Sequence, residues 1–585
     1  MAFPSDVRVA PPLVPDKGSG RDSSRWRRIS ATGLVLTGLL IVVGWLVFIP
    51  LAGLVFTAFS EDTAFGPGAF TFANFVNAFD THGTALMLSN TLITAMGAAI
   101  LSLLFGGGLA FVVERTDAPG RHIFHVLALL SFAIPGLLAT MAWMLVFSPN
   151  IGWANAVLRN AFGLTKPIFD IYSITGMIWA LATHYFTLAY FLMGSAFRAT
   201  DSSMEEAAVV FGAGHWQVAG RITLPLLRPT ILSALLLLFV RGIETFEVPR
   251  LIGLPAHIHV FTTEIQNATS SLPPEFGLAA ALGIGLLAMC VIGVYLYSRI
   301  KVPAQRRSGV KASGRPLRLG RKRWLVTLVT SLLFVICLGL PLFTLLWQSF
   351  FVNVTPPSLD TAGFTFGNYS EIIQYPLFRE AVADSSLLGA LAATIVVIMT
   401  FMLAWLAQRS AKRYAWLIDA FAFTPIAIPS VVIGATILFT YLLVPVPVYN
   451  TIWILLIAYV TMYMPLGMRF ASSAISQINS ELEEVAAVAG AGTLQIVRRV
   501  LLPLLAPALM AAWLYIFMLG VRDVGASIFL AGPDTPVLGT LSLTMWEEGG
   551  SYGAVSALGI IQIVPLVIIA TLMRWFEYRV TRQNP

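Results

Sequence analysis

Four charged residues interrupt a long apolar stretch of the sequence, in the segment RGIETFEVPR at 241–250. They are Arg241, Glu244, Glu247 and Arg250, each three residues after the one before. On a helix this spacing places the side chains roughly on one face, where opposite charges can pair. The cluster is therefore either an internal ladder of ion pairs or the lining of a polar route, and the elements around it decide which.

The composition sets the surroundings of this cluster. Of the 585 residues, 57% are hydrophobic and only 11% are charged, and the mean hydropathy is +0.81. A soluble globular chain has about 25% charged residues. The composition therefore excludes a soluble protein and indicates a polytopic membrane protein, for which we predict an all-α fold.

About a dozen apolar stretches have the roughly 20 residues that a helix needs to cross the hydrocarbon core. In the first part of the chain they lie near 31–58, 87–113, 124–147, 173–197, 230–249 and 276–298. In the second part they lie near 324–349, 385–407, 415–443, 451–470, 508–530 and 556–576. At 1.5 Å per residue, Arg241 lies about 16 Å along the fifth stretch, near the bilayer midplane. Charges at that depth are costly and usually face a cavity or a partner charge.

Basic residues predict the orientation of these spans, because Lys and Arg are retained on the cytoplasmic side. The loop at 60–86 has no Lys or Arg, whereas the segment 299–323 has ten basic residues and no acidic one. The two tails add Arg21, Arg25, Arg27, Arg28, Arg574, Arg579 and Arg582. We expect both termini and the central linker to be cytoplasmic. Retention of basic residues on this side explains the net charge of +7 without nucleic acid, and a basic strip beside the membrane could also contact lipid headgroups.

The chain repeats itself. FTFANF at 70–75 recurs as FTFGNY at 364–369, and the pair Ile134-Pro135 recurs as Ile428-Pro429, both at an offset of 294. Further along, the offset falls to 278, which places about 16 extra residues near 148–172. Each half then has six spans starting on the same side, as in parallel repeats. The predicted regions are a disordered tail (1–28), a first half (29–298), a basic linker (299–323) and a second half (324–585).

The two halves carry different charges at a related level of the membrane. At the offset of 278, Glu244 corresponds to Arg522 and Thr245 to Asp523. Such asymmetry would suit an asymmetric cargo or an ion pair between the halves. The candidates for lining a route are Arg241, Glu244, Glu247, Arg522 and Asp523.

A second repeated feature lies between the fourth and fifth spans of each half. EEAAVVFGAGHWQVAGRITLPLLRP at 205–229 and EEVAAVAGAGTLQIVRRVLLPLLAP at 483–507 match at 14 of 25 positions. Acids suit a helix start, glycines permit a sharp turn, and prolines mark the start or kink of a new helix. We expect each segment to form a short helix, a turn and another short helix that fits a groove on a soluble partner. A helix lying on lipid is the alternative, which the duplication disfavours.

These segments resemble the EAA loop of type I ATP-binding-cassette (ABC) importer permeases. The first carries Glu206-Ala207-Ala208, Gly212 and Ile222-Thr223-Leu224-Pro225; the second repeats it with Val485 where the family usually has Ala. The resemblance covers almost the whole chain outside the first 25 residues and the linker. It implies that each loop is a coupling helix seated on an ATPase. The implied coupling residues are Glu206, Ala207, Ala208, Gly212, Pro225, Glu484, Ala486, Gly490 and Pro503.

The same resemblance implies the partners and the location. These are two copies of an ABC ATPase, which use ATP and Mg, and a periplasmic or extracellular substrate-binding protein, at the bacterial inner membrane. The chain itself would bind no cofactor. Two fused six-span halves and the segment RGIETFEVPRLIGLP at 241–255 resemble most the ferric iron transport permeases and their relatives. Iron is the implied cargo, with thiamine, phosphonate and polyamine as alternatives.

Other functional classes lack the residues that they need. The sequence has no G-x-x-x-x-G-K-[ST] phosphate loop, no HExxH and no CxxC, and His257 and His259 are too few ligands for a firm metal site. We therefore do not expect an enzyme. An ion-coupled secondary transporter also has two six-span halves but has no use for twin docking loops. A membrane enzyme or receptor scaffold would need a catalytic constellation or a soluble sensor domain.

Overall fold

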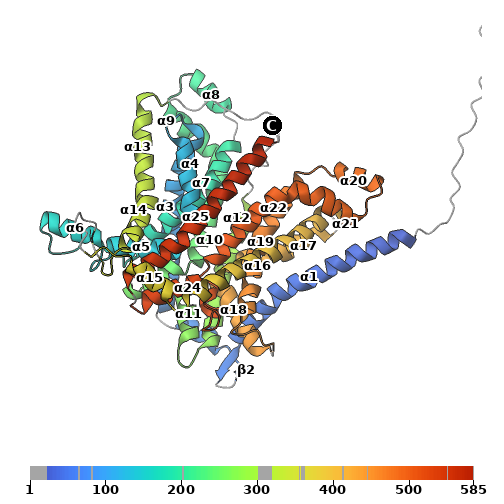
Figure 1. The fold of residues 1–585 in the computed structure, drawn as a ribbon, viewed down its shortest axis with the longest axis horizontal. Coiled ribbons are helices and arrows are strands. Elements are labelled where there is room, and N and C mark those ends of the chain that lie inside the picture. The colour runs from blue at the N-terminus through green and yellow to red at the C-terminus, as the bar shows by residue number, and fades with distance from the viewer. Residues whose placement is uncertain are drawn as a thin grey trace, which may run out of the picture.

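The computed structural model describes residues 23–583 except 64–65, 81–82, 200–202, 301–318, 355, 357–362, 411–413, 445 and 550. Ten helices in these residues are long and apolar enough to cross a membrane, by length and composition. Two further helix pairs, bent by 98° and 102°, bring the number to 12 if each pair is one span. The predicted mostly helical fold with about twelve spans is confirmed (Figure 1).

The spans of the first half are α1 (Ser23–Ala58), α3 (Gly83–Arg115), α4 (Arg121–Ala133) with α5 (Gly136–Phe147), α7 (Ile174–Ala199), α10 (Leu224–Glu244) and α12 (Phe276–Arg299). Those of the second half are α13 (Arg323–Phe334) with α14 (Leu340–Gln348), α16 (Phe378–Trp405), α17 (Ala415–Phe423) with α18 (Ser430–Leu443), α19 (Ile452–Ser476), α22 (Leu502–Val521) and α25 (Tyr552–Gln583). Helix α1 begins at Ser23, inside the segment 1–28 that we predicted as a disordered tail. Most of the predicted linker lies outside the described residues.

Shorter elements connect the spans. In the first half they are β1 (Ser60–Thr63), β2 (Gly66–Phe70), α2 (Ala73–Asp80), α6 (Trp153–Phe162), α8 (Ser203–Val210), α9 (His215–Val218) and α11 (Phe261–Ser270). In the second half they are α15 (Gly367–Gln374), α20 (Glu481–Val488), α21 (Thr493–Ile496), α23 (Ser527–Leu530) and α24 (Leu538–Glu547). Strands β1 and β2 pair antiparallel, which the sequence did not predict. Helix α6 accounts for the extra residues expected near 148–172.

The two halves exchange their first spans. Helix α1 packs against α12 of its own half and against α18 of the other, and α14 packs in the same way against α25 and α5. Trp45 on α1 donates a hydrogen bond of 3.0 Å to the hydroxyl of Tyr441 on α18. Because equivalent helices make equivalent cross contacts, the halves are related as parallel repeats would be.

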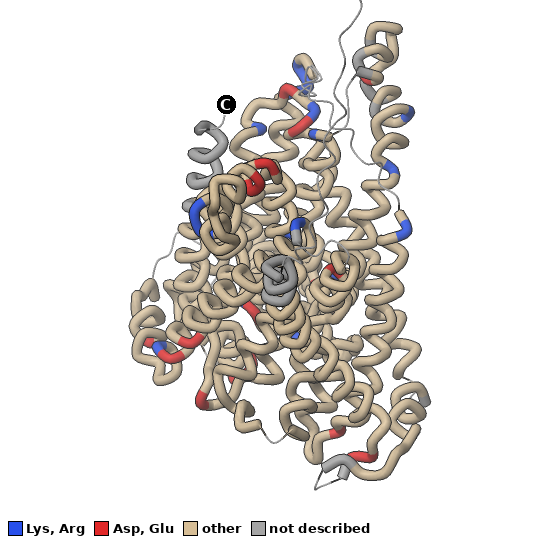
Figure 2. The backbone as a smooth tube through the Cα atoms, turned by 90° about the vertical axis from the view of Figure 1, so that its right-hand side faces the viewer, with Lys and Arg blue, Asp and Glu red and all other residues tan. Residues whose placement is uncertain are grey.

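The two ends of the helix bundle carry different elements. We call the end with α8, α9, α20 and α21 the loop end, and the end with β1, β2 and α11 the hairpin end (Figure 1). Figure 2 shows Lys and Arg segments gathered toward the top, where α8 lies, while strand β1 at the opposite end carries Glu61 and Asp62. The distribution of charge therefore differs between the ends, as the sequence suggested.

The third span of each half is broken at the repeated Ile-Pro pair. Helix α4 ends at Ala133 and α5 begins at Gly136, and the second half breaks between Ala427 and Ser430. A proline lacks the N–H and disfavours the helical conformation in the residue before it. The stretches 124–147 and 415–443, which we predicted as single spans, are therefore sharply bent.

The asparagine of the repeated FTFxN motif donates hydrogen bonds to backbone carbonyls at the end of the first span. The Asn74 amide donates hydrogen bonds of 3.1 and 2.8 Å to two backbone carbonyls there, and the Asn368 amide donates bonds of 2.9 and 3.2 Å to the equivalent pair. Both asparagines are buried. Gly277 and Gly553, at the start of the last spans, pack so closely on these amides that a Cβ would clash. The motif is thus a joint between the first and last spans of each half.

Replacing Asn368 by Ala should lower the thermal stability of the detergent-solubilised protein. The Ser349 carbonyl would lose its donor, at a cost of about 1–3 kcal/mol, and the Phe351 carbonyl would keep only the bond from Gln348. The measurement is the midpoint of thermal unfolding. Gln374→Ala, an exposed change on the same helix α15, is the control and should leave the midpoint unchanged. If the Asn368→Ala variant unfolds at the same midpoint as the control, Asn368 does not stabilise the contact between the first and last spans.

Candidate functional site

The fifth span of each half ends early, and charged residues surround the break. Helix α10 ends at Glu244 because the chain turns to an extended conformation at Thr245, where ψ is 141°, and α22 ends at Val521. The two predicted fifth spans are present, but they end at Glu244 and Val521, before the predicted ends at 249 and 530. Non-helical backbone at membrane depth persists only where it is buried in protein or lines a cavity. These breaks mark the centre of the candidate site.

Of the ion pairs predicted along 241–250, only the one between Arg241 and Glu244 is present. Arg241 and Glu244 form an ion pair one turn apart on α10, and the Arg241 side chain is 49% exposed. The Tyr185 hydroxyl donates a 3.2 Å hydrogen bond to the Arg241 carbonyl. Glu247 lies beyond the break, where its charge interacts with that of Arg522 from the other half. Charges of the two halves therefore influence each other at this level, although Glu247 and Arg522 form no ion pair within 4.0 Å.

Arg522 joins the halves at the break in α4. Its Nη1 donates a 2.8 Å hydrogen bond to the carbonyl of Phe132 and lies 3.5 Å from that of Ile134. Its guanidinium also lies over the Phe132 ring, 5.2 Å from the centroid. The last carbonyls of a helix have no partner within the helix and favour a nearby cation. A cation of the second half thus satisfies the backbone that the Ile134-Pro135 break leaves free.

Asp523 holds a local turn. Its carboxylate accepts hydrogen bonds of 3.2 Å from the backbone N–H groups of Ala526 and Ser527, and one of 2.9 Å from the Ser527 hydroxyl. The buried Tyr459 hydroxyl bonds to the same Ser527 hydroxyl at 2.9 Å. The Asp523 carboxylate, which we predicted as part of a route, is thus occupied at the start of α23.

The twin loops have the same local structure. In each, a short helix, α8 or α20, is followed by a turn and a second short helix, α9 or α21. Gly212 and Gly490 both have a φ of 85°, the left-handed region in which an L side chain is strained. Pro225 and Pro503 occupy the second positions of α10 and α22. The expected helix, turn and helix are present in both halves.

The loops expose apolar side chains at the loop end. Phe211 is 91% exposed in the first loop, and Val488 is 90% exposed in the second. Of the predicted coupling residues, Glu484 and Ala207 are exposed, and Ala208 and Ala486 are half-buried. The Glu206 side chain lies outside what the structure describes. Exposed apolar side chains beside carboxylates are typical of a surface that binds another protein.

Glu205 and Glu483 anchor the two loops. Each lies directly before a glutamate that we predicted as a coupling residue, and the sequence analysis did not identify either as an anchor. Glu483 accepts a 2.8 Å hydrogen bond from Nε of Arg409. Glu205 lies 3.7 Å from Nη1 of Arg115 and accepts a 2.8 Å bond from the Thr223 hydroxyl. Arg115 and Arg409 are themselves related by the offset of 294, at the loop end of the second spans. Because both the arginine and the glutamate recur in the two halves, the sequence did contain a signal that could have revealed this pairing.

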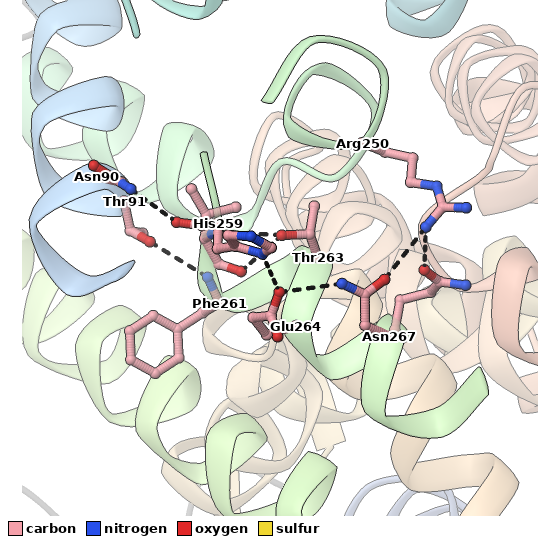
Figure 3. Close-up of polar contacts among 10 residues, drawn as sticks. Asn90, Thr91, Arg250, His259, Phe261, Thr263, Glu264 and Asn267 are labelled. Carbon is pink, nitrogen blue, oxygen red and sulfur yellow. Dashed lines mark hydrogen bonds and ion pairs between the residues drawn. The ribbon is translucent and has the colours of Figure 1, made fainter. Parts of the chain in front are cut away.

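A polar network ties the halves together at the hairpin end. Arg250, expected to continue the ladder, instead forms a two-point ion pair with Glu547 of the second half, with bonds of 2.6 and 2.9 Å. Figure 3 shows the support behind it: Arg250 contacts Asn267, which donates to Glu264, which bonds to His259. The backbone carbonyl of His259 in turn accepts from Asn90 on α3 (Figure 3). Among the described residues no cluster of three or more His, Cys, Asp or Glu could hold a metal ion.

Comparisons with known proteins follow this division into halves. The profile of the family described as "Binding-protein-dependent transport system inner membrane component" matches residues 102–301 and 397–582, one segment in each half. The chain is 23% identical over 556 residues to the ferric transport system permease protein FbpB of Actinobacillus pleuropneumoniae, covering 93% of this chain and 78% of that protein. It is 24% identical over 506 residues to the Fe(3+)-transport system permease protein FbpB 2 of Haemophilus influenzae, covering 85% and 90%.

A solved structure also aligns with part of the chain. It is the crystal structure of a bacterial ABC transporter involved in the import of the acidic polysaccharide alginate. The alignment has 21% sequence identity and a TM-score of 0.40, and it covers 48% of this chain and 100% of that chain.

Replacing Arg522 by Met should destabilise the assembled halves. The change removes the donor of the Phe132 carbonyl and the positive charge beside Glu247, and an unsatisfied buried carbonyl alone costs about 1–3 kcal/mol. Thermal unfolding in detergent measures the loss. Arg321→Met, at an exposed position near the start of α13, is the matched control. Equal unfolding midpoints for the two variants would show that Arg522 does not hold the break.

Proposed function

Because this chain belongs to the family of binding-protein-dependent transport system inner membrane components, and is thus the permease subunit of an ABC importer, we propose that its twin loops couple two ATPase subunits to a central path for ferric iron. Membrane subunits of this family are not enzymes, and ATP is hydrolysed by their partners. The observation that carries the proposal is the duplicated loop, with the same left-handed glycine and the same arginine anchor in both halves.

Each loop has the properties of a lever. Its outer surface presents the exposed side chains of Phe211 or Val488 to an ATPase cleft. Its inner surface is tied by Glu205 or Glu483 to the arginine at the end of the second span. Movement of the ATPase would therefore pass to the second span through an ion pair and to the fifth span through continuous backbone. Differential contacts with two ATPase states are sufficient to shift the balance between two permease conformations.

We assign the loop end to the cytoplasm of the bacterial inner membrane, with both chain termini on that side. The basic segment 299–323 and the acidic hairpin strand β1 support this orientation. The hairpin end then faces the binding protein. The ion pair between Arg250 and Glu547 closes that end, and its separation accompanies opening toward the binding protein.

The cargo assignment comes from the relatives. The two ferric transport permeases align over most of this chain, although at 23% and 24% identity. Thiamine, phosphonate and polyamine are the remaining candidates. The protein described as "Putative 2-aminoethylphosphonate transport system permease protein PhnV" of Salmonella typhimurium is 27% identical over 248 residues, which is 42% of this chain. Ferric iron is the first candidate because its relatives extend over both halves.

A Gly490→Ala change should weaken ATPase binding, whereas Gly492→Ala should not. Neither glycine has a neighbour that a Cβ would meet, but only Gly490 has a positive φ. A β-carbon in the left-handed region costs roughly 1 kcal/mol or more, which would distort α20 and α21. Co-purification from native membranes, with the bound ATPase quantified by mass spectrometry, measures the effect. An ATPase retained equally by both variants, or absent from the wild type, would refute coupling through this turn.

Reconstituted with its ATPase and binding protein, the permease should accumulate radiolabelled ferric iron in liposomes only when ATP is present. Competition with unlabelled thiamine, phosphonate or polyamine should leave iron uptake unchanged. Uptake that proceeds without ATP would support the secondary transporter instead. If another cargo is taken up in an ATP-dependent manner, the protein is still an ABC importer, but its cargo is not ferric iron.

A further inference from the structure

Arg469 lines two hollows. The smaller lies at the boundary between the halves, and the larger is lined by residues of the second half alone. The larger, of about 280 Å³, is lined by Ala407, Gln408, Ala415, Asp419, Phe423, Arg469 and Ser472. The smaller, of about 70 Å³, is lined by Leu236, Leu237, Val240, Arg241, Glu244, Val294, Tyr297, Ile426 and Arg469. The smaller hollow follows α10 over eight residues, or about 12 Å, from Leu236 to the central charges at Glu244. The larger hollow lies nearer the loop end, because Gln408 and Ser472 belong to the ends of the second and fourth spans there.

The equivalent place on the other side is filled by aromatic rings. The residues equivalent to Ile426, Arg469 and Leu237 are Phe132, Phe191 and Tyr515. Phe132 stacks on Tyr515 with centroids 5.6 Å apart, and it meets Phe191 edge to face at 6.4 Å.

Polar groups nearer the loop end are also paired on this filled side. Glu114, the equivalent of Gln408, forms an ion pair with Arg198. His125, the equivalent of Asp419, bonds to the Tyr190 hydroxyl. The two sides therefore differ at equivalent positions: aromatic rings pack together on one side, and the smaller hollow lies on the other.

The charged residue at the end of each fifth span, Arg522 or Glu244, explains this difference. On the filled side Arg522 donates to the Phe132 carbonyl and draws the broken helix of the other half against it. Its equivalent, Glu244, is a carboxylate and cannot donate to the carbonyls of the second broken span. It pairs with Arg241 on its own helix instead. Ile426 is consequently left at the wall of a hollow.

The charges around the smaller hollow leave a net positive side chain. Arg241 and Glu244 neutralise each other. Arg469 is exposed and forms no ion pair with another described residue within 4.0 Å. Asp419 lines only the larger hollow, nearer the loop end. A cargo that leaves the centre along this route therefore meets a guanidinium without an ion-pair partner in the described part of the chain, on the one residue that lines both hollows.

We propose that the exit path runs on this one side only, through the two hollows, and that Arg469 selects there for cargo bearing an exposed anionic group, such as ferric iron held by an oxyanion or carboxylate. The proposal rests on the proposed function in taking the boundary between the halves as the route. A guanidinium suits planar or tetrahedral oxyanions because its donors form a rigid fork. A bare metal cation would be repelled at this point.

Cysteine accessibility tests the one-sided path. Cys290 and Cys337 are the two cysteines of the chain and both are buried, so Cys290→Ala and Cys337→Ala give a cysteine-free background. Leu236→Cys and Leu514→Cys are a matched pair, because identical half-buried residues occupy equivalent positions. In inverted membrane vesicles without ATP, a membrane-impermeant methanethiosulfonate should modify Leu236→Cys and leave Leu514→Cys unmodified. Equal modification of both, or no modification of Leu236→Cys, would overturn the one-sided path.

The charge of the reagent tests the role of Arg469. At Leu236→Cys, we compare the modification rates of a sulfonate-bearing and a trimethylammonium-bearing reagent, each divided by its rate with a free thiol in solution. The normalised rate of the sulfonate-bearing reagent should be roughly five-fold higher. Adding Arg469→Gln should abolish this preference, and Arg469→Lys should keep it. A preference that is absent, or that survives Arg469→Gln, would overturn the selectivity.

This labelling needs neither an ATPase nor a cargo. A failure of ATPase co-purification would therefore refute the coupling role while leaving the labelling result to be judged separately.

Discussion

The hydrogen bond from Arg522 to the carbonyl of Phe132 is the contact on which the centre of this protein depends. A membrane span broken at a proline leaves carbonyls that neither lipid nor its own helix can satisfy. Here the donor comes from the other half of the chain, so the break in α4 and the end of α22 stabilise each other. The guanidinium also brings positive charge near Glu247, which limits the cost of that carboxylate at membrane depth.

The duplicated scaffold and the unequal charges have separate consequences. The scaffold repeats closely: each half has a broken third span, an early end to its fifth span, and an asparagine packed on a glycine between its first and last spans. The charges do not repeat, because Glu244 stands where the second half has Arg522. One half can therefore donate to the other's broken span, and the other half cannot. A nearly symmetric framework thus contains an asymmetric interior.

The same helices connect the interior to both ends. At the loop end, Glu205 and Glu483 tie each loop to the second span, and the loop continues into the fifth span. At the hairpin end, Arg250 follows the fifth span of the first half and pairs with Glu547. In the coupling that we propose, a displacement of the first loop would pass along α10 to the central charges and then to this ion pair. Rigid helices held by a few ion pairs suit switching between two arrangements.

The sequence by itself determined the membrane class, the twelve spans, the parallel repeats and the twin loops. Each of these follows from local chemistry: apolar length, basic segments, and glycines and prolines at repeated positions. Only the tertiary structure decided that the third spans bend, that the fifth spans end at Glu244 and Val521, and that Arg250 leaves the ladder for Glu547. It also showed that Glu205 and Glu483 face inward. The pairing of Arg250 depends on which group of the other half lies within hydrogen-bond reach, and the pairings of Glu205 and Glu483 depend on distant arginines of their own halves. Spacing along one helix cannot report a partner about 300 residues away.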